Sequence, residues 1–159
     1  MGDFSGNINI YEDLVPSDIT ELLKEEHLHS LQFYNFQNPN RKTWQVLNEF
    51  YQSNPQFGLH IFWYDVVDFS FLDYILSVRN LSVTSFLTTD FTPLLKMLNL
   101  KKLSIGETKS TSIDLSFISE FKSLQSLYID GMKKGLQSIA KLSELKILTL
   151  RGKICNSRL

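Results

Sequence analysis

The sequence predicts an α/β repeat solenoid with a parallel sheet on its concave face and short α or 3₁₀ helices on its convex face. The main observation is an apolar phrase, Leu-x-x-Leu-x-Ile/Val/Leu, that recurs along the chain. Its four clearest copies are centred on Leu81, Leu103, Leu127 and Leu148. They are about 22 residues apart, a period typical of units that combine one strand with a return segment. Apolar residues also precede each copy at every third position, which favours a short helix with one buried edge.

The N-terminal part of the chain is predicted to contain a cap and two less regular repeats. Residues 1–27 form the cap, in which Ser17 and Asp18 precede a mostly apolar stripe and predict a helix over residues 19–26. Weaker copies of the apolar phrase follow at residues 28–33 and 56–61. Between them, residues 41–52 place apolar side chains on one helical face. This pattern predicts a full α-helix, which explains why this repeat is longer.

The later repeats follow one order, a helical segment and then a strand. Each strand is expected to alternate, with its apolar residues in the core and the residues between them facing outward. About six repeats therefore occupy residues 28–152, residues 153–159 form an irregular tail, and the whole chain is one domain. The strands are expected to pass through six buried leucines: Leu31, Leu59, Leu81, Leu103, Leu127 and Leu148.

Two segments carry a resemblance to a known family. In residues 90–95, Asp-Phe-Thr-Pro-Leu-Leu, and in residues 114–118, Asp-Leu-Ser-Phe-Ile, an acidic residue precedes an apolar residue and a short helical turn. This pattern resembles the leucine-rich repeat family, and is nearest to the short repeats of bacterial internalin-like proteins. The resemblance covers residues 69–152 strongly and 14–68 loosely. It implies a curved solenoid, a parallel sheet on the concave side and a role in protein recognition.

The chain departs from the family pattern in the turn after each strand. The family has an asparagine three residues after the last strand leucine, where its side chain bonds the backbone of the turn. Other residues stand at these positions: Phe36, Phe86, Thr108, Met132 and Lys153. We therefore expect loops that are less uniform than those of a regular repeat array.

Composition and charge argue against several classes of function. The formal net charge is −1, which predicts no attraction to nucleic acid or to an anionic membrane. Residues 1–13 lack the basic and apolar regions of a secretion signal. No apolar run reaches the roughly 18 residues of a membrane span. A single cysteine, Cys155, can form no internal disulfide, and these features together predict a cytoplasmic protein.

Residues suited to catalysis or metal binding are few. The histidines, which lack the cysteines or the second histidine pair of a zinc site, are His27, His29 and His60. Asp65, Asp68 and Asp73 are close in sequence, but each also fits as a helix cap or a loop residue. No phosphate-binding loop and no Gly-x-Ser-x-Gly nucleophile motif occurs. The sequence predicts no enzyme activity, no cofactor and no metal site.

Aromatic residues in the outward positions of the strands predict a binding surface. Such residues on the face of a sheet are typical anchors of protein interfaces. The candidate anchors are Tyr34, His60, Phe62, Trp63 and Tyr128. An alternative of equal weight is that residues 1–16 fold over them as a cap, because the end of a solenoid has to be covered.

Three classes of function remain open. The first is a protein-interaction module that binds a protein partner through its concave face, and a toxin-neutralising immunity protein is one form of it. The second is a structural part of a larger assembly, and the third is an enzyme that uses residues 65–73. The last strand has no capping helix after it, so Ile147, Leu148 and Leu150 are expected to be exposed or shared. Either the array is truncated there, or the edge strand mediates self-association.

Overall fold

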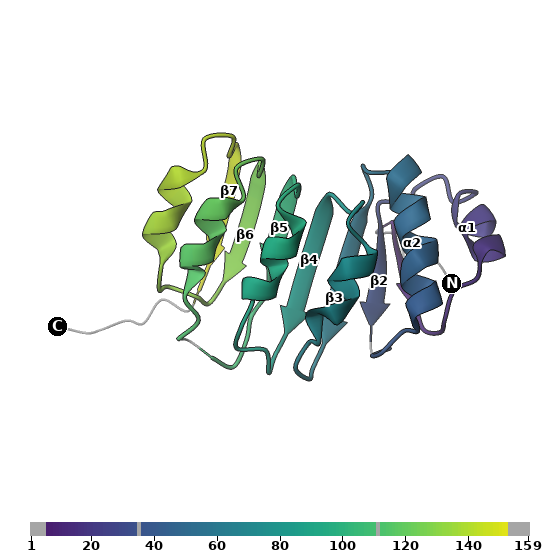
Figure 1. Cartoon of the computed structure of the whole chain (residues 1–159), viewed down its shortest axis with the longest axis horizontal. Helices are drawn as coiled ribbons and strands as arrows, with labels where there is room; N and C mark the ends of the chain where they lie inside the picture. The colour runs from purple at the N-terminus through teal and green to yellow at the C-terminus, as the bar shows by residue number, and fades with distance from the viewer. Residues whose placement is uncertain (1–5, 35, 111, 153–159) are drawn as a thin grey trace.

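A single sheet of seven parallel strands is the central feature of the computed structural model, which describes residues 6–34, 36–110 and 112–152 (Figure 1). The strands lie in the sheet in the order in which they occur in the sequence. Their bounds are β1 Asn7–Ile10, β2 Ser30–Tyr34, β3 Gly58–Trp63, β4 Asn80–Ser85, β5 Lys102–Ile105, β6 Ser126–Asp130 and β7 Ile147–Arg151. The α/β class with a parallel sheet is therefore confirmed, and the arrangement is compatible with a repeat solenoid.

Short helices connect consecutive strands and lie on one face of the sheet (Figure 1). A parallel pair needs such a crossover, because the chain has to return to the starting end of the next strand. The helices are α1 Pro16–Leu22, α2 Arg41–Ser53, η1 Phe69–Tyr74, η2 Thr92–Met97, η3 Leu115–Glu120 and η4 Leu136–Lys141. The last four are 3₁₀ helices, in agreement with the apolar period of three.

The first helix begins earlier than the sequence pattern predicts. Its first residue is Pro16 rather than Ile19, and Val15 is the cap. Proline is favoured at the first helical position because its missing N–H would have no partner there. The Asp18 carboxylate also accepts a hydrogen bond from the Val15 N–H at 2.7 Å, which completes the helix start one turn ahead of the predicted one.

The register of the sheet aligns the repeated leucines in one column. Leu31, Leu59, Leu81, Leu103, Leu127 and Leu148 occupy equivalent positions on neighbouring strands. Five of them are at most 2% exposed, as predicted. Leu148 is 45% exposed, so its predicted burial in the column is wrong, while the expected exposure of Ile147, Leu148 and Leu150 at the last strand is confirmed. Its strand, β7, is the last of the sheet and has a neighbouring strand on one side only among the described residues.

The N-terminal segment contains a strand that the sequence pattern did not predict. Asn7 to Ile10 form β1, which pairs with β2 from Asn7↔Ser30 to Ile10↔Phe33. Residues 7–10 therefore lie at the edge of the sheet. The alternative interpretation placed residues 1–16 across the aromatic face, and residues 7–10 do not lie there. This strand has only four residues, and an alternation of polar and apolar residues over so short a segment does not distinguish a strand from a loop.

Aspartate side chains hold the turns that lead into three of the 3₁₀ helices. Asp68, Asp90 and Asp114 each accept a hydrogen bond from the backbone N–H two residues later, at 2.8 to 2.9 Å. Thr88 adds a buried acceptor for the Val67 N–H at 2.8 Å. Buried backbone groups need such partners because an unpaired one costs stability. These contacts confirm that Asp68 is a helix cap.

Candidate functional site

The face of the sheet opposite the helices is here called the open face. Side chains of a strand alternate between the two faces, so the residues between the buried apolar positions lie on the open face. On it, His60 lies between Gln32 and Ser82 of the neighbouring strands, and Ser104 lies beside Tyr128. This face is polar and half-exposed over most of its length, which makes its aromatic part distinct.

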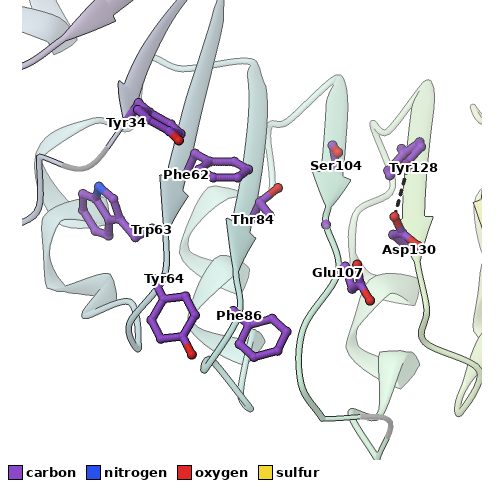
Figure 2. A pocket seen from close by; sticks show the side chains of 11 residues that line it. Tyr34, Phe62, Trp63, Tyr64, Thr84, Phe86, Ser104, Glu107, Tyr128 and Asp130 are labelled. Atoms are coloured by element: carbon purple, nitrogen blue, oxygen red, sulfur yellow. Dashed lines mark hydrogen bonds between the residues drawn. The ribbon is translucent and has the colours of Figure 1, made fainter.

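A groove of about 540 Å³ lies on the open face at the carboxyl ends of β2 to β6 (Figure 2). The carboxyl end of a parallel sheet is where ligands usually bind in open α/β folds. The residues that line the groove are Tyr34, Phe62, Trp63, Tyr64, Thr84, Phe86, Ser104, Gly106, Glu107, Tyr128 and Asp130.

Four exposed aromatic side chains form one side of the groove, and we call them the aromatic cluster: Tyr34, Phe62, Tyr64 and Phe86. Tyr34 stacks on Phe62 with 5.3 Å between ring centroids, and Tyr64 stacks on Phe86 at 5.4 Å. Their exposed fractions run from 38% to 63%. Figure 2 shows the two pairs one above the other on neighbouring strands. Exposed aromatic patches are uncommon on the surfaces of monomeric proteins, so this cluster is the candidate for an interaction site.

The opposite side of the groove is polar. The Tyr128 hydroxyl donates to Asp130 Oδ2 at 3.3 Å, and Glu107 lies on the adjacent loop (Figure 2). The interaction with the Tyr128 hydroxyl, followed by the nearby charges of Asp130 and Glu107, raises the pKa of Arg151. The groove therefore combines an apolar side with carboxylates that can accept hydrogen bonds.

The structure brings together part of the predicted set of anchors. Tyr34, Phe62 and Tyr128 line the groove. Sequence reasoning missed Tyr64 and Phe86, although a usable signal existed. Tyr64 lies two residues after the outward position Phe62, and Phe86 lies two residues after the outward position Thr84. The alternation of side chains therefore continues one residue beyond each strand and places both aromatic rings on the open face.

Trp63 is buried, unlike the other candidate anchors, and its role in partner binding stays a prediction. Although it borders the groove, its side chain is only 6% exposed. The indole lies among buried rings, with its centroid 6.5 Å from that of Phe33 and 6.1 Å from that of Phe71. Its Nε1–H donates to the Phe36 carbonyl at 2.9 Å. It follows Phe62 directly, so strand alternation turns it toward the helices.

His60 lies on the open face but outside the groove. Its side chain is half-buried, and burial lowers its pKa from the ordinary value of 6.5. The unfolded chain therefore binds a proton at His60 more readily than the folded chain does. The contribution of His60 to the free energy of unfolding therefore decreases as the pH drops through the ordinary pKa range of histidine.

We expect the free energy of unfolding to decrease between about pH 7.5 and pH 5.5, and the variant His60→Gln to reduce this decrease. Glutamine keeps a polar side chain of similar size and does not titrate. Urea denaturation at both pH values measures the difference. Hydrogen bonds from Ser116 lower the pKa of Asp114 from its ordinary value, and a downward shift moves the titration of this carboxyl further from the window. An identical pH dependence in both proteins contradicts this prediction.

The histidines and aspartates considered for catalysis or metal binding do not line the groove. Asp68 caps η1, and the Asp73 carboxylate forms an exposed ion pair with Lys96 at 2.7 Å. Among the described residues, no group of three or more His, Cys, Asp or Glu side chains is placed to hold a metal ion. Within the same residues, no helix is long and apolar enough to cross a membrane.

Comparisons with known proteins add no family to this description. No protein-family model matches the chain, and no curated protein matches its sequence.

Proposed function

We propose that this chain is a leucine-rich repeat solenoid of the internalin-like kind, and that it binds a protein partner through the groove on its open face. The repeat period, the in-register leucine column and the 3₁₀ return segments support the first part. The observation that carries the second part is the exposure of two stacked aromatic pairs beside carboxylates.

The chemistry of the groove favours a polypeptide as the partner. Tyrosine and phenylalanine contribute large apolar areas at low entropic cost and dominate the energetics of protein interfaces. The carboxylates of Glu107 and Asp130 suit a basic or hydrogen-bond-donating group next to an apolar anchor. We therefore expect a partner segment with an apolar side chain against the aromatic cluster and a donor opposite Asp130. A toxin neutralised by this chain is one partner of that chemistry.

We expect Phe62→Ala to weaken partner binding by about 2 kcal/mol or more, which is roughly a 30-fold rise in Kd. Phe62 stacks on Tyr34 and is 43% exposed, so its loss removes contact area without opening the core. The partner is first captured from the source cell with the wild-type chain as bait. Its Kd for the purified variants is then measured by calorimetry.

Leu76→Ala is the matched control for this experiment. Leu76 is 52% exposed, follows η1 and lies away from the groove, so its truncation leaves the partner's Kd unchanged. Equal affinity of Phe62→Ala and Leu76→Ala for the partner rules out the groove as the binding surface. Failure to capture any protein that distinguishes the wild type from Phe62→Ala contradicts the proposed function as a whole.

A further inference from the structure

The groove on the open face is bounded by an aromatic side and a carboxylate side that lie close together. Phe86 follows β4, Glu107 follows β5, and Asp130 ends β6. The three strands are neighbours in the sheet, so about one strand spacing, roughly 5 Å, separates their backbones at each step. Figure 2 shows Glu107 between Phe86 and Asp130. A single long side chain of a bound polypeptide can therefore contact an aromatic ring and both carboxylates.

The floor of the groove carries small groups between these two sides. Gly106 has no side chain, and a Cβ added to it would meet the Thr84 side chain. Thr84 and Ser104 supply the hydroxyl groups of the floor, and both residues are half-exposed. The volume of about 540 Å³ between the two sides is therefore open to an inserted side chain.

The charges that line the groove are negative. Among the described residues, its lining contains the carboxylates of Glu107 and Asp130 and no cationic side chain. The Tyr128 hydroxyl donates to Asp130 Oδ2, which leaves Oδ1 as an acceptor. Lys109 and Arg151 are exposed cations close to these carboxylates in sequence or register. Within the part of the chain that the structure describes, no ion pair joins either cation to them, so both carboxylates are accessible to a cation of the partner.

We propose that the groove receives an arginine side chain of the protein partner, with its guanidinium group between Phe86 and the carboxylates of Glu107 and Asp130. The planar face of a guanidinium stacks on aromatic rings, while its N–H groups donate to carboxylates in the same plane. The stacked pair of Tyr34 and Phe62 remains for an apolar side chain next to the arginine. This inference rests on the proposed function, because the arginine belongs to the polypeptide that binds there.

Arginine fits this arrangement better than the other side chains that a partner can insert. The ammonium group of lysine is a compact and strongly hydrated charge that has no planar face to stack on a ring. An apolar side chain contacts the rings but brings no donor to the carboxylates, and covering a polar group without a hydrogen bond costs binding energy. An acidic side chain is repelled by Glu107 and Asp130. The combination of ring and carboxylates therefore selects a planar cation.

Titration of the isotope-labelled chain with N-acetyl-arginine methylamide, followed by NMR, tests the proposal without the partner. We expect the backbone resonances of Gly106, Glu107 and Asp130 to shift in a saturable way. The corresponding citrulline derivative keeps the planar group without the charge, and the lysine derivative keeps the charge without the plane. Each should bind about fivefold more weakly or less. Equal binding of either derivative overturns the proposal, and so does the absence of a saturable shift with the arginine derivative.

Neutral substitutions of the two carboxylates test the same inference with the captured partner. Glu107→Gln combined with Asp130→Asn should raise the partner's Kd about tenfold or more and make it less dependent on salt. Glu49→Gln combined with Glu120→Gln is the matched control. It also removes two exposed carboxylates, but these lie on α2 and η3, on the opposite face of the sheet, so the partner's Kd should not change.

The variant Phe62→Ala distinguishes a failure of this inference from a failure of the proposed function. A partner that loses affinity for Phe62→Ala but binds the double variant of Glu107 and Asp130 as tightly as the wild type overturns the arginine site and leaves the proposed function standing. Saturable binding of the arginine derivative by a chain that captures no partner has the opposite meaning. It supports an arginine site in the groove and contradicts the proposed function.

Discussion

Leu127→Ala is expected to lower the free energy of unfolding by about 2–5 kcal/mol, the range for truncation of a core leucine. Leu127 is fully buried and lies between Leu103 and Leu148 in the sheet register. Its removal leaves a cavity that the neighbouring strands cannot fill, because their positions are held by the backbone ladder on both sides. Urea denaturation followed by circular dichroism measures the change from the shift in midpoint.

Leu148→Ala is the matched control, since Leu148 occupies the same repeat position on the edge strand. Its side chain is 45% exposed, so truncation removes little buried area and leaves no enclosed cavity. We expect a loss below about 1.5 kcal/mol for this variant. Equal losses at the two positions show that β7 is as well covered as β6, and they contradict the open end of the sheet.

Gly135→Ala is the second variant for which we expect a large loss of stability. Gly135 caps η4 with φ of +81°, a backbone conformation that costs an L-residue about 1–2 kcal/mol. An added Cβ also lies 2.5 Å from Asp114 Oδ1 and 2.7 Å from the Ser116 nitrogen. The second atom is backbone and cannot move without displacing η3, so overpacking adds about 1–3 kcal/mol. The total expected loss is about 2–5 kcal/mol.

Gly131→Ala separates the two contributions to that loss. Gly131 has nearly the same backbone conformation, with φ of +79°, but an added Cβ meets no atom within 4 Å. Only the conformational cost of about 1–2 kcal/mol remains. Thermal or urea denaturation of the two variants measures the difference, which is the effect of close packing between η3 and η4. If both variants lose the same stability, the turn at Gly135 is not packed against Asp114 and Ser116 as described.

The recurring apolar phrase determined much of the fold from the sequence alone. Each copy carries both periods, three in the return segment and two in the strand, so helix and strand alternate at the predicted places. The shared phase of Leu103 and Leu127 was enough to predict their alignment on neighbouring strands. The alignment can be predicted because each repeat contacts mainly the repeats before and after it in the sequence. The apolar pattern of consecutive repeats therefore indicates which residues lie next to each other in the fold.

Tertiary structure alone decided the features that depend on what lies beside a residue. The pairing of Asn7–Ile10 with β2 turns a four-residue segment into a strand. Alternation places Phe62 on the open face and buries Trp63, while hydrophobicity alone puts both in one aromatic group. Leu148 shares the apolar pattern of Leu127 yet is exposed. The expectation that the last strand is exposed came from the residues that follow it and not from this pattern, because the pattern of one repeat does not specify the next. Sequence periodicity determines which face a side chain occupies, but the presence of an adjacent element determines whether that face is covered.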